Sequence, residues 1–221
     1  MVPFRAVAEC LGYDVEWVDF VRTVKIKARH KSWVGEIVEI KGKGVVVVAT
    51  DKTRGSGYIS SGSRYGELDV ETCYHVVEDA SKIRVKAYNG KWYRAEVKYV
   101  RPDKDLARLT VDGWESEIGN LLSECYWWGR GEEQVQVGEE IVVIGHPLGL
   151  EGSVSTGITS AKRYLPRYPG DEWPVPVYQI TAPVSPGSSG APVFDREGAW
   201  VGHVVGTFEE GQLINIVVGR W

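Results

Sequence analysis

The chain has 221 residues, of which 43% are hydrophobic and 25% charged, and its formal net charge is −4. This is the composition of an ordinary globular protein long enough to bury a core, and without a basic patch it is not typical of a nucleic-acid-binding protein. The three cysteines cannot all pair with one another, and their spacing indicates neither a disulfide framework nor a zinc site. No apolar stretch is long enough to span a membrane. The first residues do not form a signal peptide, so we expect that a leader has been removed or that export does not use one.

Residues 1–28 differ in rhythm from the rest of the chain. Residues 2–13 carry apolar side chains at helical spacing, which predicts a short helix. Residues 14–17 and 23–27 alternate between polar and apolar, as the two strands of a hairpin do. This helix and hairpin resemble the last part of the small stalk domain found at the N-terminus of copper amine oxidases and many bacterial surface proteins. We expect a docking or spacer element here, and no copper ligand is carried over.

Residues 29–43 are charged and punctuated by glycine, so they are expected to include a linker. From residue 44 onward the chain consists of short apolar or alternating runs separated by turns, a pattern typical of an all-β sandwich or barrel. The strongest turn signal is Asn89-Gly90, between two alternating runs. Strands are expected at residues 45–48, 57–60, 82–88, 91–100, 106–111, 140–144, 153–161, 175–181, 191–194, 200–205 and 213–218.

Three short stretches carry residues suited to nucleophilic catalysis. Residues 185–194 contain a Gly-x-Ser-Gly turn, in which glycines allow a sharp backbone bend that presents the hydroxyl of Ser189. His75 and Asp105 lie in the other two stretches, residues 71–80 and 101–109. A hydroxyl nucleophile needs a base, and the base needs an orienting carboxylate. The order His, Asp, Ser therefore suggests a catalytic triad.

With these motifs the chain resembles a trypsin-like serine protease of the HtrA type, the group of DegP and DegQ. That family carries a Gly-Ser-Gly loop, Thr-x-x-His-Val, Asp-Leu-Ala, Gly-x-Pro-x-Gly and Gly-Asn-Ser-Gly-Gly, which are matched here at residues 55–57, 72–76, 105–107, 145–149 and 187–191. The resemblance covers residues 44–221. It implies an all-β fold of two six-stranded antiparallel β-barrels, at about residues 44–130 and 131–221, behind a small α+β extension. The peptide-binding PDZ module of many HtrA-type proteins is expected to be absent.

The resemblance also assigns roles to individual residues. Ser189 would attack the peptide carbonyl, His75 would take and return its proton, and Asp105 would orient the imidazole. The backbone N–H groups of Gly187 and Ser189 would form the oxyanion hole, each donor contributing roughly 3–4 kcal/mol. Neither a cofactor nor a metal ion is expected.

Two positions depart from the family pattern. Ser188 stands where the family has Asn or Asp, so it cannot form the ion pair that activates digestive relatives, and the loop must order itself in another way. Ala191 stands where the family has Gly, which costs little unless its φ is positive.

The S1 pocket of the resembling fold is lined by the segment before the nucleophile and by a later strand. No Asp stands at Pro183, which disfavours a Lys or Arg preference. Alternation turns Val204 inward and His203 outward, which predicts a small aliphatic pocket, but a one-residue slip would put His203 in S1 and favour Glu or Gln. The residues expected to line the pocket are Pro183, Val184, Val204, Val205 and Gly206.

Two classes of function fit these residues. One is an active serine endopeptidase that cuts unfolded or extended polypeptides. The other is a catalytically silent module that keeps the fold and holds a peptide in its cleft, although such a relative would be free to lose triad members. The family resemblance suggests a location outside the cytoplasm, and a monomer and a trimer both remain open.

Overall fold

The computed structural model describes residues 13–18, 23–28, 32–62, 68–111, 113, 134–165, 175–207 and 215–219. The chain divides into two compact units, Met1–Glu36 and Ile37–Trp221. In the first unit, β1 (Tyr13–Val18) pairs antiparallel with β2 (Thr23–Ala28), which confirms the predicted hairpin. The helix predicted over residues 2–13 lies outside the described residues. Among the helices that the structure describes, none combines the length and the apolar character needed to cross a bilayer.

A helix, α2 (Trp33–Lys41), occupies most of the segment that was interpreted as a linker. The side chain of Ser32 caps its N-terminus by accepting a hydrogen bond of 3.1 Å from the N–H of Gly35. Ile37 is buried, and a Cβ placed on Gly198 would lie 3.7 Å from its Cγ1. The segment expected to include a linker thus forms a helix over residues 33–41, because a capping serine and a buried apolar residue outweigh the charged composition.

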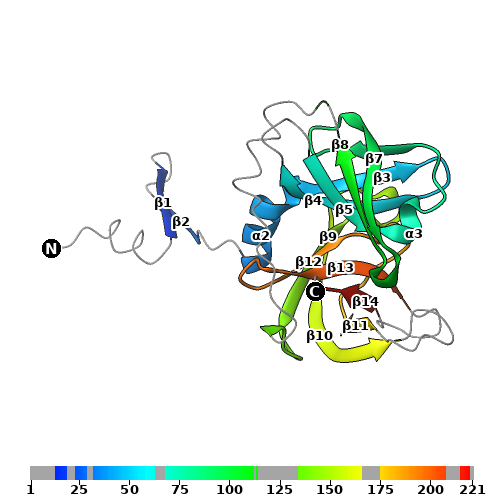
Figure 1. Cartoon of the computed structure of the whole chain (residues 1–221). Coiled ribbons are helices and arrows are strands. Elements are labelled where there is room, and N and C mark those ends of the chain that lie inside the picture. The colour runs from blue at the N-terminus through cyan, green and yellow to red at the C-terminus, as the bar shows by residue number, and fades with distance from the viewer. Residues whose placement is uncertain are drawn as a thin grey trace. The chain divides into compact units, whose positions relative to one another are not determined.

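The first barrel closes through the strand order β3-β4-β5-β8-β7-β6, and all its pairs are antiparallel (Figure 1). Its valine-rich first strand is buried on both faces, which explains why that run does not alternate. The strands are β3 (Val45–Thr50), β4 (Arg54–Gly62), β5 (Leu68–Cys73), β6 (Ile83–Lys86), β7 (Trp92–Arg101) and β8 (Leu106–Val111). Two short helical turns, α3 (Tyr74–Val77) and η3 (Pro102–Lys104), follow β5 and β7.

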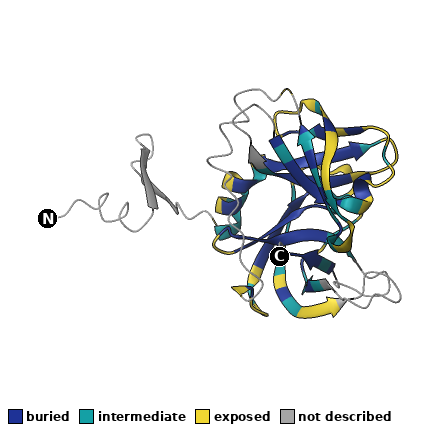
Figure 2. Cartoon of the chain, in the orientation of Figure 1, coloured by how far each residue is buried: buried dark blue, intermediate teal, exposed yellow. Residues whose placement is uncertain are grey.

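The second barrel closes through the order β10-β11-β14-β13-β12-β9. A 3₁₀ turn, η5 (Pro147–Gly149), follows its first strand. Each barrel has its own cluster of buried hydrophobic residues, and the strands of both barrels carry many buried residues (Figure 2). The prediction of two six-stranded antiparallel barrels is confirmed. The strands are β9 (Glu140–Gly145), β10 (Ser153–Leu165), β11 (Val175–Ile180), β12 (Pro192–Asp195), β13 (Trp200–Thr207) and β14 (Asn215–Val218).

The two barrels meet where β4 and β5 contact β13 and the loop before β12. The thiol of Cys73 donates to the carbonyl of Val204 at 3.1 Å, which links β5 to β13. The rings of Tyr58 and Trp200 pack across the same junction with centroids 5.6 Å apart. Strands β4 and β5 of the first barrel are thereby held against β13 of the second barrel.

Candidate active site

His75 and Asp105 form a hydrogen-bonded pair at the edge of the first barrel. The Nδ1 of His75 lies 2.6 Å from Oδ2 of Asp105, and the backbone N–H of His75 donates to Oδ1 at 2.9 Å. The Asp105 side chain is 5% exposed, whereas that of His75 is 40% exposed. Because an ionised carboxylate only accepts hydrogen bonds, Nδ1 must carry the proton, which leaves Nε2 of a neutral ring with a free lone pair. The pair thus has the arrangement of an oriented general base.

The backbone places Asp105 where it can reach His75. Asp105 lies between η3 and β8 in the left-handed region, with φ 50°, a conformation that aspartate tolerates better than most residues. Its own carbonyl accepts a hydrogen bond of 3.0 Å from the N–H of Tyr74. Both the backbone and the side chain of Asp105 therefore bind the start of α3, so the distance between the two functional groups is fixed.

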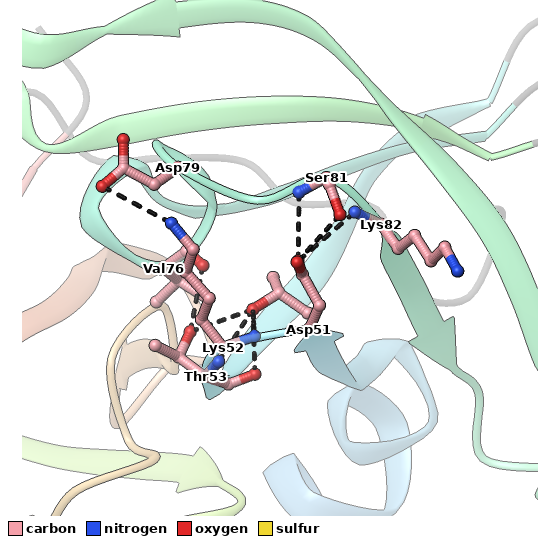
Figure 3. Close-up of polar contacts among 8 residues, drawn as sticks. Asp51, Lys52, Thr53, Val76, Asp79, Ser81 and Lys82 are labelled. Atoms are coloured by element: carbon pink, nitrogen blue, oxygen red, sulfur yellow. Dashed lines mark hydrogen bonds and ion pairs between the residues drawn. The ribbon is translucent and has the colours of Figure 1, made fainter.

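The turn between β3 and β4 holds the other end of the segment that carries His75 (Figure 3). The hydroxyl of Thr53 donates to the carbonyl of Val76 at 3.1 Å, directly after His75. The Asp51 carboxylate accepts hydrogen bonds from both the N–H and the hydroxyl of Ser81, at 3.0 and 2.8 Å. Hydrogen bonding to the Ser81 hydroxyl lowers the pKa of Asp51, which keeps this acceptor ionised.

The loop that carries Ser189 has its carbonyls bound and two of its amides free. The carbonyls from Ser185 to Ser189 each accept a hydrogen bond, whose donors in order are Ser188 N, Leu148 N, Ser56 Oγ, Ala191 N and Ser56 N. Among the described residues, the N–H groups of Gly187 and Ser189 have no acceptor. Because the C=O and N–H of a trans peptide point in opposite directions, the hydrogen bonds to the carbonyls of Pro186 and Ser188 fix the directions of the N–H groups of Gly187 and Ser189. Two unpaired donors on one loop are the arrangement that an oxyanion hole requires.

Side chains of the loop explain its order and the two departures from the family pattern. Ser188 is buried, and its Oγ accepts from the N–H of Ser185 at 3.3 Å, so a neutral residue closes the turn. Ala191 is not among the described residues with positive φ, so it carries no such strain. Gly190 has φ +84°, and a Cβ on it would lie 2.1 Å from the carbonyl oxygen of Ser56. Only glycine fits at that position.

The loop lies beside the helix that carries His75. A Cβ on Gly55 would lie 2.9 Å from Cγ2 of Val76 and 3.0 Å from the carbonyl oxygen of Ser189. Val76 follows His75 directly, so one glycine of β4 is in contact with both the nucleophile loop and α3. The loop of Ser189 in the second barrel and the helix of His75 in the first barrel thus both lie against Gly55.

Comparison with known proteins identifies the family. The model of the trypsin-like peptidase domain matches residues 55–202. The chain belongs to the trypsin-like peptidase family.

Relatives of this peptidase domain include proteins named probable periplasmic serine endoprotease DegP-like. That of Chlamydia muridarum (strain MoPn / Nigg) is 33% identical over 152 residues, which are 69% of this chain and 28% of that protein. That of Pseudomonas putida (strain GB-1) is 36% identical over 149 residues, or 67% and 28%. The chain thus spans less than a third of the length of these relatives. The likeness supports the resemblance to HtrA-type proteases seen in the motifs.

Solved structures of peptidases have the same fold. The serine endoprotease from Yersinia pestis is 26% identical, with a TM-score of 0.68 over 86% of this chain and 63% of that one. An inactive form of Rv3671c from M. tuberculosis H37Rv is 25% identical, with a TM-score of 0.69 over 83% and 84%. The resemblance of residues 1–28 to part of a stalk domain stays a prediction.

Two of the residues expected at S1 of this peptidase domain, Val204 and Val205, lie on opposite faces of β13. Val204 is buried in the core of the second barrel, against which the half-buried Val184 packs. Val205 packs instead against the core of the first barrel, because successive strand residues point to opposite faces; its place in S1 stays a prediction. Gly206 is open, since a Cβ there would meet no atom within 4 Å, and Pro183 is exposed.

His203 lies on the face of β13 away from Val204. It is 1% exposed and lines a small pocket of about 130 Å³ together with Glu71, Arg108 and Trp200. Burial lowers its pKa, while the carboxylates of Asp105 and Glu71 act in the opposite direction. This pocket lies at the junction of the barrels and does not include Val184 or Val204.

A buried polar cluster in this region has no counterpart in the sequence predictions. The carboxylate of Glu71 is 2% exposed and accepts hydrogen bonds from the hydroxyl of Tyr58 at 2.5 Å and from Arg108 at 2.6 Å. A buried carboxylate must be paired in this way to remain charged. The sequence predicted a strand at residues 106–111, but not which acid Arg108 would meet.

His146 lies in a Gly-His-Pro turn, which favours a structural role over a catalytic one, and its contacts fit that interpretation. It follows β9, is 8% exposed, and its Nδ1 accepts the N–H of Gly152 at 3.0 Å. Burial lowers its pKa to about 4; the charge of Glu151 acts in the opposite direction, and that of Lys86 adds to the lowering. A neutral ring is required for the acceptor role at Nδ1.

One cluster has the residue types of a metal site. The thiol of Cys73, the imidazole of His75 and the carboxylate of Asp105 offer atoms within 4.8 Å of one another. Two of these three groups are already joined by the 2.6 Å contact between His75 and Asp105, and the thiol donates to a backbone carbonyl. Zinc bonds of about 2.0–2.3 Å would require ligand atoms to lie farther apart than that contact. The arrangement is that of a hydrogen-bonded pair over a buried thiol.

Proposed function

We propose that this protein is a serine endopeptidase of the HtrA type that hydrolyses peptide bonds through an acyl-enzyme. The observation that carries the proposal is the combination of an oriented His75–Asp105 pair with two unpaired amides on the loop of Ser189. Family membership supports the same conclusion, because the matched domain is described as a peptidase.

The proposed reaction uses these groups in sequence. The Oγ of Ser189 attacks the scissile carbonyl while Nε2 of His75 takes its proton. The oxyanion of the tetrahedral intermediate accepts hydrogen bonds from the N–H groups of Gly187 and Ser189. His75 then gives the proton to the leaving amine, and a water repeats the sequence on the acyl-enzyme. Asp105 holds the tautomer throughout and stabilises the imidazolium.

We propose a preference for small aliphatic residues at P1. Val184 and Val204 share the face of the second barrel beside the nucleophile loop, and Gly206 leaves the adjoining position open. His203, whose entry into S1 would favour Glu or Gln, lies in a different pocket with Glu71 and Arg108. An aliphatic pocket discriminates by about 1–3 kcal/mol per methylene, so the preference should be graded.

The substrates are proposed to be unfolded or extended polypeptides, since a peptide must enter a cleft between two barrels. The relatives named above are called periplasmic, so we place this protein outside the cytoplasm.

Replacement of the nucleophile tests the activity. Ser189→Ala should abolish hydrolysis of a denatured protein substrate while the circular dichroism spectrum and the Tm stay close to wild type. Ser160→Ala, which also removes a hydroxyl that binds a backbone carbonyl in the second barrel, serves as the matched control and should remain active. Hydrolysis that persists in purified Ser189→Ala contradicts the assignment. Peptide binding without hydrolysis in the wild type would instead favour the silent module.

Cleavage-site profiling tests the pocket. Sites cut in a denatured protein mixture should show Val, Ala and related aliphatic residues at P1, with Arg and Lys poor because an unpaired cation would be buried. A dominant Glu or Gln signal that disappears in His203→Ala would show that β13 presents the other face to the substrate.

A further inference from the structure

Ser56 lies outside the proposed triad, yet all of its polar groups bind the surroundings of the nucleophile. It is completely buried in β4. Its N–H donates to the carbonyl of Ser189 at 2.8 Å, and its own carbonyl accepts the hydroxyl of Thr72 at 2.7 Å. Its hydroxyl donates to the carbonyl of Gly187 at 2.8 Å and accepts from the N–H of His146 at 2.9 Å.

The direction of the hydrogen bond to Gly187 is fixed by these partners. A serine hydroxyl has one proton and two lone pairs. The N–H of His146 occupies a lone pair, and a carbonyl oxygen can only accept, so the proton must point at the carbonyl of Gly187. Because the Ser56 side chain itself is completely buried, we expect no solvent molecule to take over this role when the hydroxyl is removed without a change in the packing.

Gly187 is the residue of the loop whose backbone conformation most needs such a restraint. It has φ +95° and no side chain, so both of its dihedrals turn easily. The peptide plane before it is held by the N–H of Leu148, which donates to the carbonyl of Pro186 at 2.8 Å. The plane after it is held by Ser56. With both planes fixed, the N–H of Gly187 cannot turn away from the side on which it is unpaired.

We propose that Ser56 is a positioning residue of the oxyanion hole: its hydroxyl binds the Gly187 carbonyl and thereby keeps the N–H groups of Gly187 and Ser189 directed at the substrate oxyanion. Ser56 touches no reacting atom and acts through the loop. The inference rests on the proposed function, because it assumes that Ser189 is the residue acylated.

The test is a series at one position: wild type, Ser56→Cys and Ser56→Ala. The alanine variant should lose about 10- to 100-fold in kcat, less than the loss of a donor itself, because both amides remain present but misdirected. KM should stay within about twofold, since the ground-state carbonyl depends less on the hole than the oxyanion does. The thiol is a weaker donor than the hydroxyl, so Ser56→Cys should lie between the other two.

Two further readouts separate positioning from a loss of stability. Affinity for a peptide boronic acid, whose tetrahedral adduct with Ser189 places an oxygen in the hole, should fall in parallel with kcat. The pH dependence of kcat/KM should keep its midpoint, because the His75–Asp105 pair is untouched. Ser160→Ala loses a comparable hydroxyl-to-carbonyl bond in the second barrel and should change neither quantity.

Wild-type kcat and boronate affinity in a folded Ser56→Ala protein would overturn the proposal, as would a rise in KM with kcat unchanged. If the alanine variant does not fold, the cysteine variant decides in the same way. Ser189→Ala distinguishes the two failures. If it still hydrolyses peptide, the proposed function is wrong; if it is inactive while Ser56→Ala behaves as wild type, only the role of Ser56 is wrong.

Discussion

Buried His146 should make the protein lose stability as the pH falls from 7 to 5. Burial lowers its pKa to about 4 in the folded protein from an ordinary value of 6.5. Between these two values the unfolded chain binds a proton that the folded protein does not, so the free energy of unfolding rises with pH across this interval. With about 1.4 kcal/mol per pKa unit, His146 alone should lower that free energy by about 2 kcal/mol between pH 7 and pH 5. Buried His203 acts in the same direction, because its pKa is also lowered.

The measurement is urea unfolding followed by tryptophan fluorescence at pH 7, 6 and 5, in wild type and in His146→Asn. Asparagine is the matched replacement, since its side-chain oxygen can accept the N–H of Gly152 in place of Nδ1. The variant should lose about 2 kcal/mol less than wild type over this pH range. Equal pH dependence in the two proteins, or an imidazole of His146 that titrates near pH 6.5 by NMR, would refute the reasoning.

Two further changes test the packing of the loop and the independence of the N-terminal region. Gly190→Ala should destabilise the protein by about 3 kcal/mol, because the new Cβ would lie 2.1 Å from the Ser56 carbonyl oxygen and φ is +84°. Gly90→Ala is the control: its φ is +79° but no atom lies within 4 Å of the new Cβ, so it should lower the free energy of unfolding by only about 1 kcal/mol. Equal losses in chemical denaturation would mean that the close approach at Gly190 is not real. A shortened chain that begins at Ser32, and so keeps the cap of α2, should still react with a fluorophosphonate, because the residues assigned to the site lie from position 56 onward. A folded but unreactive product would show that residues 1–31 help to order the active-site loop.

The sequence predicted the features that depend on local pattern. Glycines next to Ser189 indicated a sharp turn, alternation separated Val204 from His203, and the run of valines in β3 indicated a buried strand. The order of His75, Asp105 and Ser189 suggested that the histidine and the aspartate pair, the family resemblance supported it, and the structure joins the two at 2.6 Å.

What the sequence did not predict depends on contacts between distant segments. Ser56 and Gly187 are brought together only when the barrels meet, and nothing in the local pattern around Ser56 marks it as a donor to that carbonyl. The same holds for Glu71 and Arg108, which lie on paired strands. The sequence analysis did not predict helix α2, because the charged residues and glycines of this segment indicated a linker and the N-cap at Ser32 was not considered. Val205 was assigned to S1 together with Val204, although neighbours on a strand face opposite sides.

The central claim is that Ser189 is an activated nucleophile in an assembled site. Intact-protein and peptide mass spectrometry after treatment with a fluorophosphonate tests it directly, because the reagent phosphonylates a serine only when a base and an oxyanion hole act on it together. The account predicts one adduct per chain, on Ser189, which disappears in Ser189→Ala and forms far more slowly in His75→Ala. An unmodified Ser189 in folded protein, or an adduct on another residue, would contradict it.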